Sequence, residues 1–479
     1  MVALPIVRYL AVLAGLSIAV WAQDASVPGA AGTAPDTTGT VQPAAAPETK
    51  LPLQYSPNPP VSGLDEPALE PAVAVRSFFL PSLHFGQTLD TNAVGSLGGS
   101  RLEGVSRFAV GLTLQRLWKN FDVAADYVGG VGVYSTGSGA KQIQALSGEQ
   151  TALWRTGQFS VREVFSYLPE GSFGFGSYGG IGGFSLSGNG LAGGGFYGGG
   201  SNFLGAGALG SLGQVPRISS LVSADVVQTL SPRTSVTAVG SYALVHFTGN
   251  PTGYVDSNQY SGQFGGSHLL GPKDQIGVQY GYQHFEFPQG GAGSFDSQVF
   301  HLVYGHAITG RLSFVIAGGP QITILGGSPQ SPSTRSISGS GRLSLRYRFE
   351  KVGLTASYDR LNTSGSGFFY GASTDLVRVG ASRRLGRIWT TFGDAGYSYS
   401  RRLQFSILGT NANSFQSGYI GGGLRRPIGR SFNVYGSYQF NGFAFDNTFC
   451  VGVPSCNRAS FRNSFNVGLD WHARPIRLD

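Results

Sequence analysis

Histidine is the residue type in this chain that could most readily ligate a metal ion or act as a general base, but its seven copies are scattered. They are His84, His246, His268, His284, His301, His306 and His472. No pair combines i, i+2 or i, i+4 spacing with an acidic partner, as a short zinc motif would. His301 and His306 are five residues apart and would point to opposite faces of a strand. The sequence therefore predicts neither a metal site nor a bound cofactor.

Motifs for nucleotide binding and nucleophilic catalysis are also missing, since the chain has no P-loop and no G-x-S-x-G elbow. We therefore predict that the chain is not an enzyme. One alternative stays open. A hydrolase built into a β-barrel would take its Ser, His and Asp from separate strands and leave no local motif, and fold alone does not decide function.

Arginine is the other residue type whose spacing is informative. Between Arg342 and Arg360, in RLSLRYRFEKVGLTASYDR, apolar side chains alternate with charged or polar ones on both sides of a turn at 350–351. A period of two places the two kinds on opposite faces of a strand, so we expect a hairpin with one apolar and one charged face. Two strands alone are not stable in water, so another sheet or lipid must cover the apolar face.

The composition limits the possible fold classes. Charged residues make up 12% of the 479 residues, and no segment after residue 22 has a long helical period or a run of about 20 apolar residues. From Arg335 to the end there are 19 Lys or Arg against 7 Asp or Glu, whereas the preceding part has 14 against 18. These arginines are spaced along alternating strands and not clustered in a tail, so we predict no nucleic-acid partner.

The first 72 residues are expected to lie outside the main fold. Residues 1–22 carry one basic residue, Arg8, before an apolar stretch, which is typical of a secretory signal peptide. Residues 23–72 are rich in Ala, Pro and Thr, and their prolines favour an extended, solvated chain. We interpret them as a periplasmic linker, with a partner-binding segment as the alternative.

From residue 73 to residue 472 the period-two pattern recurs in about 18 segments, separated by eight short connections and nine longer loops rich in Gly, Ser and Asn. The segments lie near 74–89, 104–116, 121–133, 143–154, 158–168, 216–230, 235–247, 259–270, 275–287, 297–308, 311–325, 335–349, 352–361, 372–385, 388–400, 414–425, 431–441 and 460–472. Outer-membrane barrels alternate short periplasmic turns with long outer loops in this way, and a soluble sandwich has no reason to. We therefore predict an all-β fold, a transmembrane antiparallel up-and-down β-barrel of about 18 strands.

Residues 73–472 resemble the bacterial porin-like outer-membrane β-barrel proteins. The resemblance rests on this pattern of strands and connections and not on a family-specific motif. Alternating Phe465, Val467, Leu469 and Trp471 resemble the C-terminal assembly signal of that class, although a short tail, 473–479, follows. The resemblance implies outer-membrane lipid and the outer-membrane assembly machinery as partners. It also implies a location in the outer membrane of a Gram-negative bacterium, with both termini periplasmic, and it leaves a homo-oligomer open. Aromatic residues near strand ends suit interfacial girdles: Trp118, Tyr127, Tyr134, Trp154, Tyr347, Phe349, Trp389, Tyr397 and Tyr399.

Two segments depart from a simple barrel pattern. Glu163 shares a strand face with Phe159, Val161 and Phe165, so we expect a register change or a bulge there. The segment 171–213 has 19 Gly in 43 residues, and by position and length it resembles the loop that folds into the lumen of porins, although it lacks acidic residues. The alternative is a flexible surface loop or extra Gly-rich strands. The aromatic residues of this possible constriction loop include Phe173, Phe175, Tyr178, Phe184, Phe196 and Tyr197.

Cys450 and Cys456 lie in one loop of an exported chain, where we expect a disulfide that acts as a structural staple, with a redox pair as the alternative.

A barrel of 16–18 strands leaves an aqueous channel, so the sequence predicts a porin-like channel for passive diffusion of small hydrophilic solutes. Basic residues expected to face the lumen are Arg342, Arg346, Arg348, Arg378 and Arg384. Acidic residues expected to offset them in part are Asp122, Asp126, Asp225 and Asp359. The basic lining predicts a weak anion preference. The alternatives are a structural or adhesion barrel with a plugged lumen, and the barrel-embedded hydrolase.

Overall fold

The computed structural model describes residues 77–92, 101–135, 139–168, 216–248, 254–288, 293–326, 333–349, 352–365, 367–386, 388–404, 412–450 and 456–478. The expected signal peptide, the linker and the whole of the segment 171–213 with its aromatic residues lie outside these ranges. None of the described residues forms a helix long and apolar enough to cross a membrane.

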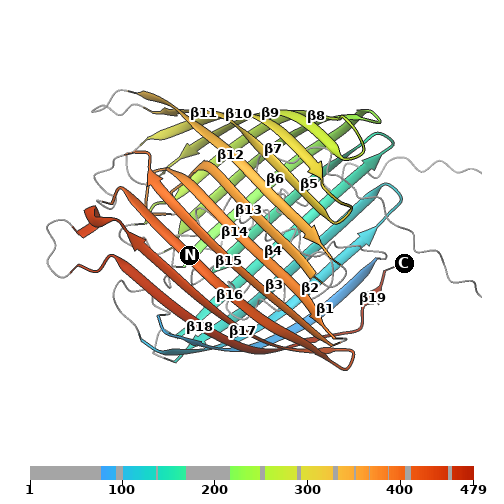
Figure 1. The fold of residues 1–479 in the computed structure, drawn as a ribbon. Coiled ribbons are helices and arrows are strands. Elements are labelled where there is room, and N and C mark those ends of the chain that lie inside the picture. The colour runs from blue at the N-terminus through green and yellow to red at the C-terminus, as the bar shows by residue number, and fades with distance from the viewer. Residues whose placement is uncertain are drawn as a thin grey trace, which may run out of the picture. The chain divides into compact units, whose positions relative to one another are not determined.

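The described residues form one antiparallel sheet of eighteen long strands and one two-residue strand (Figure 1). The strands are β1 (Phe78–Asp90), β2 (Glu103–Leu117), β3 (Phe121–Tyr134), β4 (Gly139–Trp154), β5 (Gly157–Leu168), β6 (Arg217–Ser231), β7 (Thr234–Phe247), β8 (Ser257–Leu269), β9 (Asp274–Glu286), β10 (Ser294–Ala307), β11 (Leu312–Leu325), β12 (Thr334–Arg348), β13 (Val352–Thr363), β14 (Ala372–Leu385), β15 (Trp389–Arg402), β16 (Ser414–Ile428), β17 (Phe432–Phe445), β18 (Ala459–His472) and β19 (Ile476–Arg477). A single 3-10 turn, η1 (Asn447–Cys450), follows β17.

The sheet closes on itself. Each long strand pairs with its neighbours in the chain, and β1 also pairs with β18, from Ser82 opposite His472 to Asp90 opposite Ser464. In Figure 1 the strands run obliquely side by side around this closed sheet. Closure removes both free edges of the sheet, so the backbone hydrogen bonds of the first and last long strands are satisfied within the barrel.

The structure confirms the fold class predicted from the sequence. All eighteen segments are strands, and each strand end lies within four residues of the expected position. The short connections gather at one end of the barrel, here called the turn end, and the longer ones gather at the other, here called the loop end. The last short connection falls slightly later than expected, at 429–431, because β16 continues to Ile428.

Side chains alternate between two environments, and the polar ones are inside. On β18, Asn466 and Asp470 are 1% and 3% exposed, whereas Phe465 and Val467 are 50% and 45% exposed. A protein folded for water buries its apolar face, so this inverted pattern indicates that the outer surface of the barrel is not meant to contact water.

Two expectations about individual residues are wrong. Tyr134 is buried on the inner face of β3, which it shares with Asp122 and Asp126, so it does not belong to an outer aromatic girdle. The strand that contains Glu163 has no bulge there, because Glu163 pairs in continuous register with Gly148 on β4 and with Val222 on β6. Glu163 therefore points outward, beside a glycine that leaves room for its side chain.

Candidate functional site

Two matching clusters of polar and aromatic side chains mark the edges of the apolar outer surface on β9 and β10. The clusters are Tyr282, His284 and Asp296 toward the loop end, and Tyr304, His306 and Asp274 toward the turn end. In both, the carboxylate accepts a hydrogen bond from the phenol and one from the imidazole Nδ1, each at 2.7 Å. Such amphipathic groups suit the interface between lipid and water.

The distance between these clusters fits a bilayer. Asp274 and His284 are ten positions apart on β9, and Ile276, Val278 and Tyr280 are exposed between them. Ten residues at about 3.3 Å each, on a strand tilted by about 40°, rise roughly 25 Å along the barrel axis. That is the height of the apolar band of membrane barrels, so the fold and its surface define a transmembrane β-barrel.

The inner face of β12 to β16 carries the basic side chains predicted from the sequence. Arg342, Arg346, Arg378 and Arg384 alternate with the outward-facing apolar residues and lie on the lumen side, with Arg425 of β16 added to them. The side chain of Arg348 lies outside the described residues. Arg346 and Arg384, both near the turn end, are exposed. This part of the inner face therefore gathers basic side chains from three strands.

The predicted acidic residues also lie on the inner face; Asp126, Asp225 and Asp359 are buried there, whereas Asp122 is partly exposed. Asp359 is buried and forms an ion pair with Arg342. The Nε atom of Arg342 lies 3.2 Å from Oδ1 of Asp359. Asp126 is buried and accepts a hydrogen bond of 2.6 Å from Thr113.

Arg162 on β5 is a lumen residue that the sequence reasoning missed. Its Nε lies 2.9 Å from Glu149 Oε1 on β4, and its Nη1 lies 3.3 Å from Asp225 Oδ1 on β6. The strand-by-strand pattern placed Asp225 on the inner face but could not show that a basic residue on the neighbouring strand β5 joins it to Glu149 on the far side of that strand. Register across three strands was the missing information.

A short loop between β13 and β14, residues 364–371, folds inward at the loop end. Val255 donates a backbone hydrogen bond of 2.7 Å to Gly367 O, although Val255 precedes β8 on a distant part of the wall. Gly367 has φ +80°, and a Cβ there would lie 2.5 Å from the ring of Phe247 at the end of β7. Only glycine fits this close approach.

Aromatic residues hold this inward loop in place. One buried cluster joins Phe368 and Phe369 to the strand ends of β14, β16 and β17, and a second joins Tyr370 to those of β9 and β10. The members of the first are Phe368, Phe369, Ala372, Leu376, Ala412, Phe415, Phe443 and Phe445, and those of the second are Val255, Phe285, Phe287, Phe295 and Tyr370. The run GFFYG, which places three aromatic residues in a short loop, was the sequence signal for this inward loop.

The C-terminal end of β13, at the loop end, also separates from its neighbour β12 in the barrel wall. β12 pairs with β13 only from Gly341 opposite Arg360 to Arg348 opposite Gly353, whereas β12 pairs with β11 along its whole length. Asn362 of β13 donates hydrogen bonds to Thr323 of β11 at 2.7 Å and to Ser297 of β10 at 3.4 Å. The end of β13 therefore lies inside the barrel, behind β12, and narrows the loop end together with the 364–371 loop.

Polar pairs line the inner face where β1 meets β18. Arg462 contacts Asp90 through Nη2 at 2.5 Å and Nε at 2.7 Å, and both side chains are buried. Thr88 donates a hydrogen bond to Asn466, and His84 pairs with Asp470. These contacts connect residues far apart in the sequence and lock the register of the closing strands.

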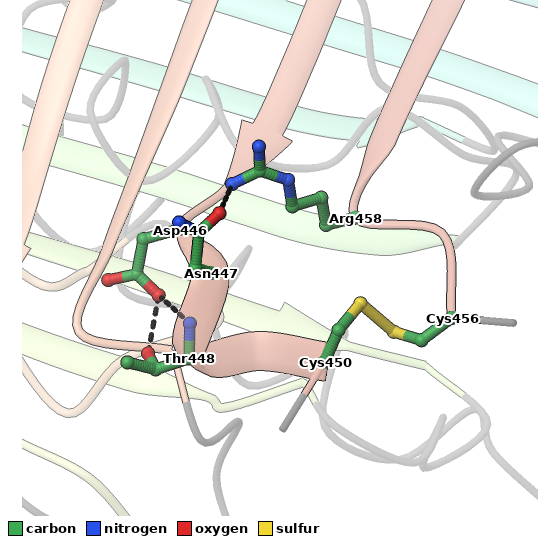
Figure 2. Close-up of a disulfide and its surroundings, with 6 residues drawn as sticks. All are labelled: Asp446, Asn447, Thr448, Cys450, Cys456 and Arg458. Atoms are coloured by element: carbon green, nitrogen blue, oxygen red, sulfur yellow. Dashed lines mark hydrogen bonds between the residues drawn. A yellow bond between two sulfur atoms is a disulfide. The ribbon is translucent and has the colours of Figure 1, made fainter. Parts of the chain in front are cut away.

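The two cysteines form a disulfide at the loop end, between η1 and β18 (Figure 2). Beside it, Asp446 accepts hydrogen bonds from the hydroxyl and the backbone N–H of Thr448 and from the backbone N–H of Asn413 and Ser414. Partial burial raises the pKa of Asp446, but these hydrogen bonds lower it more, so its pKa lies below the ordinary value. The carboxylate ties the β15–β16 connection to the β17–β18 connection.

Among the described residues, no group of three or more His, Cys, Asp or Glu side chains is arranged to hold a metal ion.

Comparison with known proteins adds structural likeness only. No protein-family model matches the chain, and no curated protein does. The solved structures that it is similar to include OccK2 (OpdF) of Pseudomonas aeruginosa, at 10% identity over 83% of this chain and 98% of that chain, with a TM-score of 0.41. OccAB3 of Acinetobacter baumannii is 10% identical over 84% and 100%, with a TM-score of 0.40. A BenF-like porin from Pseudomonas fluorescens Pf-5 is 10% identical over 85% and 100%, with a TM-score of 0.41. Likeness at this level carries no argument about function.

Proposed function

We propose that the chain is a porin-like channel of a Gram-negative outer membrane, through which small hydrophilic solutes diffuse passively with a modest preference for anions. The observation that carries this proposal is a closed barrel of eighteen long strands with an apolar outside and a polar, charged inside. Barrels of this size enclose an aqueous lumen, whereas eight-stranded barrels are filled by side chains. In this orientation the turn end and both termini are periplasmic.

The anion preference follows from how the two signs of charge are exposed. Arg346 and Arg384 are exposed on the lumen side, whereas three of the four predicted carboxylates, Asp126, Asp225 and Asp359, are buried and the fourth, Asp122, is partly exposed. A wall that presents mainly positive charge raises the local concentration of anions, and the effect fades as salt screens it. Passive diffusion itself requires no chemical step, so the channel function needs neither a cofactor nor a catalytic group.

A second function, a structural or adhesion barrel with a closed lumen, is favoured by one observation. The inward 364–371 loop and its aromatic clusters cover part of the loop end. Single-channel recording in a planar bilayer separates the two functions. Steady open steps that scale with salt concentration support the channel, and the absence of conductance from correctly folded protein supports the closed barrel.

Assembly by the outer-membrane machinery is part of the same proposal. The expected assembly residues Phe465, Val467, Leu469 and Trp471 lie on the outer face of β18, the strand that closes the barrel. A homo-oligomer is compatible with this arrangement, and chemical crosslinking in native membranes would test it.

A further inference from the structure

A serine, a histidine and an aspartate meet on the inner face of the barrel near the turn end. Ser82 and His84 are two positions apart on β1 and therefore share a face, and His84 stands directly opposite Asp470 of β18. Ser82 Oγ lies 3.0 Å from His84 Nε2, and His84 Nδ1 lies 2.8 Å from Asp470 Oδ1. All three side chains are buried on the lumen side.

The contacts fix the direction of the hydrogen bonds. A carboxylate only accepts, so His84 Nδ1 carries the proton that it donates to Asp470. Neutral His84 is then an acceptor at Nε2, and the Ser82 hydroxyl donates to it. The second oxygen of Asp470, Oδ2, is buried without a hydrogen-bond partner, so the contact to His84 is the side-chain hydrogen bond of this carboxylate.

This arrangement meets the geometric requirements for an activated nucleophile. The hydroxyl lies within 2.6–3.2 Å of a base, and a third group orients that base, as in acyl-transfer sites on unrelated folds. Among the described residues, a second Ser–His pair in the lumen has no carboxylate bonded to its imidazole. His301 Nε2 lies 2.7 Å from Ser340 Oγ, but the charged group that acts on His301 is the guanidinium of Arg342.

Ser82 has a glycine opposite it on one side and lies near the turn end of the lumen. On β2 the residue opposite Ser82 is Gly111, which has no side chain, and on β18 it is His472, which is partly exposed. His472 is the last residue of β18, so Ser82 lies close to the turn end of the lumen. Ser82 itself is 9% exposed, which suits a small acyl group better than a bulky one.

We propose that Ser82, His84 and Asp470 form a nucleophilic site that hydrolyses small carboxylic esters at the turn end of the lumen, an activity beyond passive diffusion. Ser82 Oγ attacks the ester carbonyl carbon while its proton passes to His84 Nε2. The bond to the alcohol oxygen then breaks, and the alcohol leaves with that proton. Water attacks the acyl-Ser82 carbonyl, again giving a proton to His84, and the carboxylic acid departs as Ser82 Oγ regains it. Asp470 is a positioning residue, which holds the imidazole in the required tautomer.

The test uses the full chain, folded in detergent, with a fluorophosphonate probe and with p-nitrophenyl acetate. The wild type should label on Ser82, as peptide mass mapping would show, and should hydrolyse the ester. Ser82→Ala should abolish labelling, and His84→Gln should slow both reactions by at least ~100-fold. The matched control is Ser340→Ala, which removes the hydroxyl of the other Ser–His pair and should leave both reactions unchanged.

Asp470 needs a readout that a purely structural role would not change. Asp470→Asn should slow labelling by at least ~100-fold while the folded band on a heat-modifiability gel persists, and Asp470→Glu should restore part of the rate. Wild-type protein that shows this folded band yet labels no faster than Ser82→Ala, or labels on another serine, would overturn the proposal. Because channel conductance is measured separately, failure here leaves the proposed channel function intact.

Discussion

Removing the guanidinium of Arg462 should loosen the seam where β1 and β18 close the barrel. Arg462 contacts Asp90 through two nitrogens, at 2.5 Å and 2.7 Å, and the two side chains are 3% and 0% exposed. Arg462→Ala leaves the Asp90 carboxylate buried without its charged partner. Breaking a buried ion pair from one side costs about 3–5 kcal/mol, because the remaining charge has lost both water and its counter-ion.

The double variant Arg462→Met with Asp90→Leu should recover much of that loss. Replacing both members of a buried pair with apolar residues of similar volume is often neutral, since no charge is left unpaired. The matched surface control is Arg401→Ala, because Arg401 is exposed on the outer face of β15 and its removal should cost less than about 1 kcal/mol.

Urea unfolding of the barrel in lipid vesicles, followed by tryptophan fluorescence, measures these differences as shifts of the midpoint at constant slope. The expected order of stability is wild type, then the surface control, then the double variant, with Arg462→Ala clearly lowest. If Arg462→Ala lost no more than Arg401→Ala, the pair would not stabilise the closing seam, and the reasoning from burial would be refuted.

Three further predictions concern assembly, the loop-end contacts and the pore. Phe465→Asp and Trp471→Asp each place a charge on the outer face of β18 and should sharply reduce heat-modifiable protein in the membrane; normal amounts would exclude the assembly signal. Asp446→Ala should destabilise the barrel at pH 7. Because the folded pKa of Asp446 lies below the ordinary value of 3.8, its contribution is fully present above that value and is lost as pH falls through the folded pKa, so the difference in urea midpoint between variant and wild type should shrink as pH falls below 3.8. Gly367→Val should push the inward loop away from Phe247 and raise single-channel conductance, and an unchanged conductance would show that this loop does not limit the pore.

Strand positions could be predicted from the sequence because a period of two is a local signal. In β12 the alternation of Arg342 and Arg346 with Leu343 and Leu345 fixed both the strand and the side that faces the lumen. Tyr134 lies near a strand end, but the same period places it on the inner face of β3 with Asp122 and Asp126, so nearness to a strand end does not by itself indicate a girdle residue.

Contacts between distant strands could not be predicted in this way. The pairing of His84 with Asp470 depends on the register of β1 against β18, which lie at opposite ends of the sequence. The inward 364–371 loop depends on packing against β7, β10 and β17, and no periodicity within the loop encodes those partners. At Glu163 the local pattern predicted an irregularity that the strand does not have. The pairing with β4 and β6 is regular on both sides, so a single polar residue on the outer face does not require a bulge.

The reversal potential of single channels under a salt gradient tests the central claim most directly. The measurement uses purified full-length protein in a planar bilayer at low ionic strength, where screening is weakest. An open channel lined by exposed Arg346 and Arg384 should show steady conductance and a modest anion preference. The preference should fall in the combined variant Arg342→Ser, Arg346→Ser and Arg348→Ser and fade at high salt. A cation preference in the unmutated channel would contradict the proposed role of the basic wall, and silence from correctly folded barrels would contradict the channel itself.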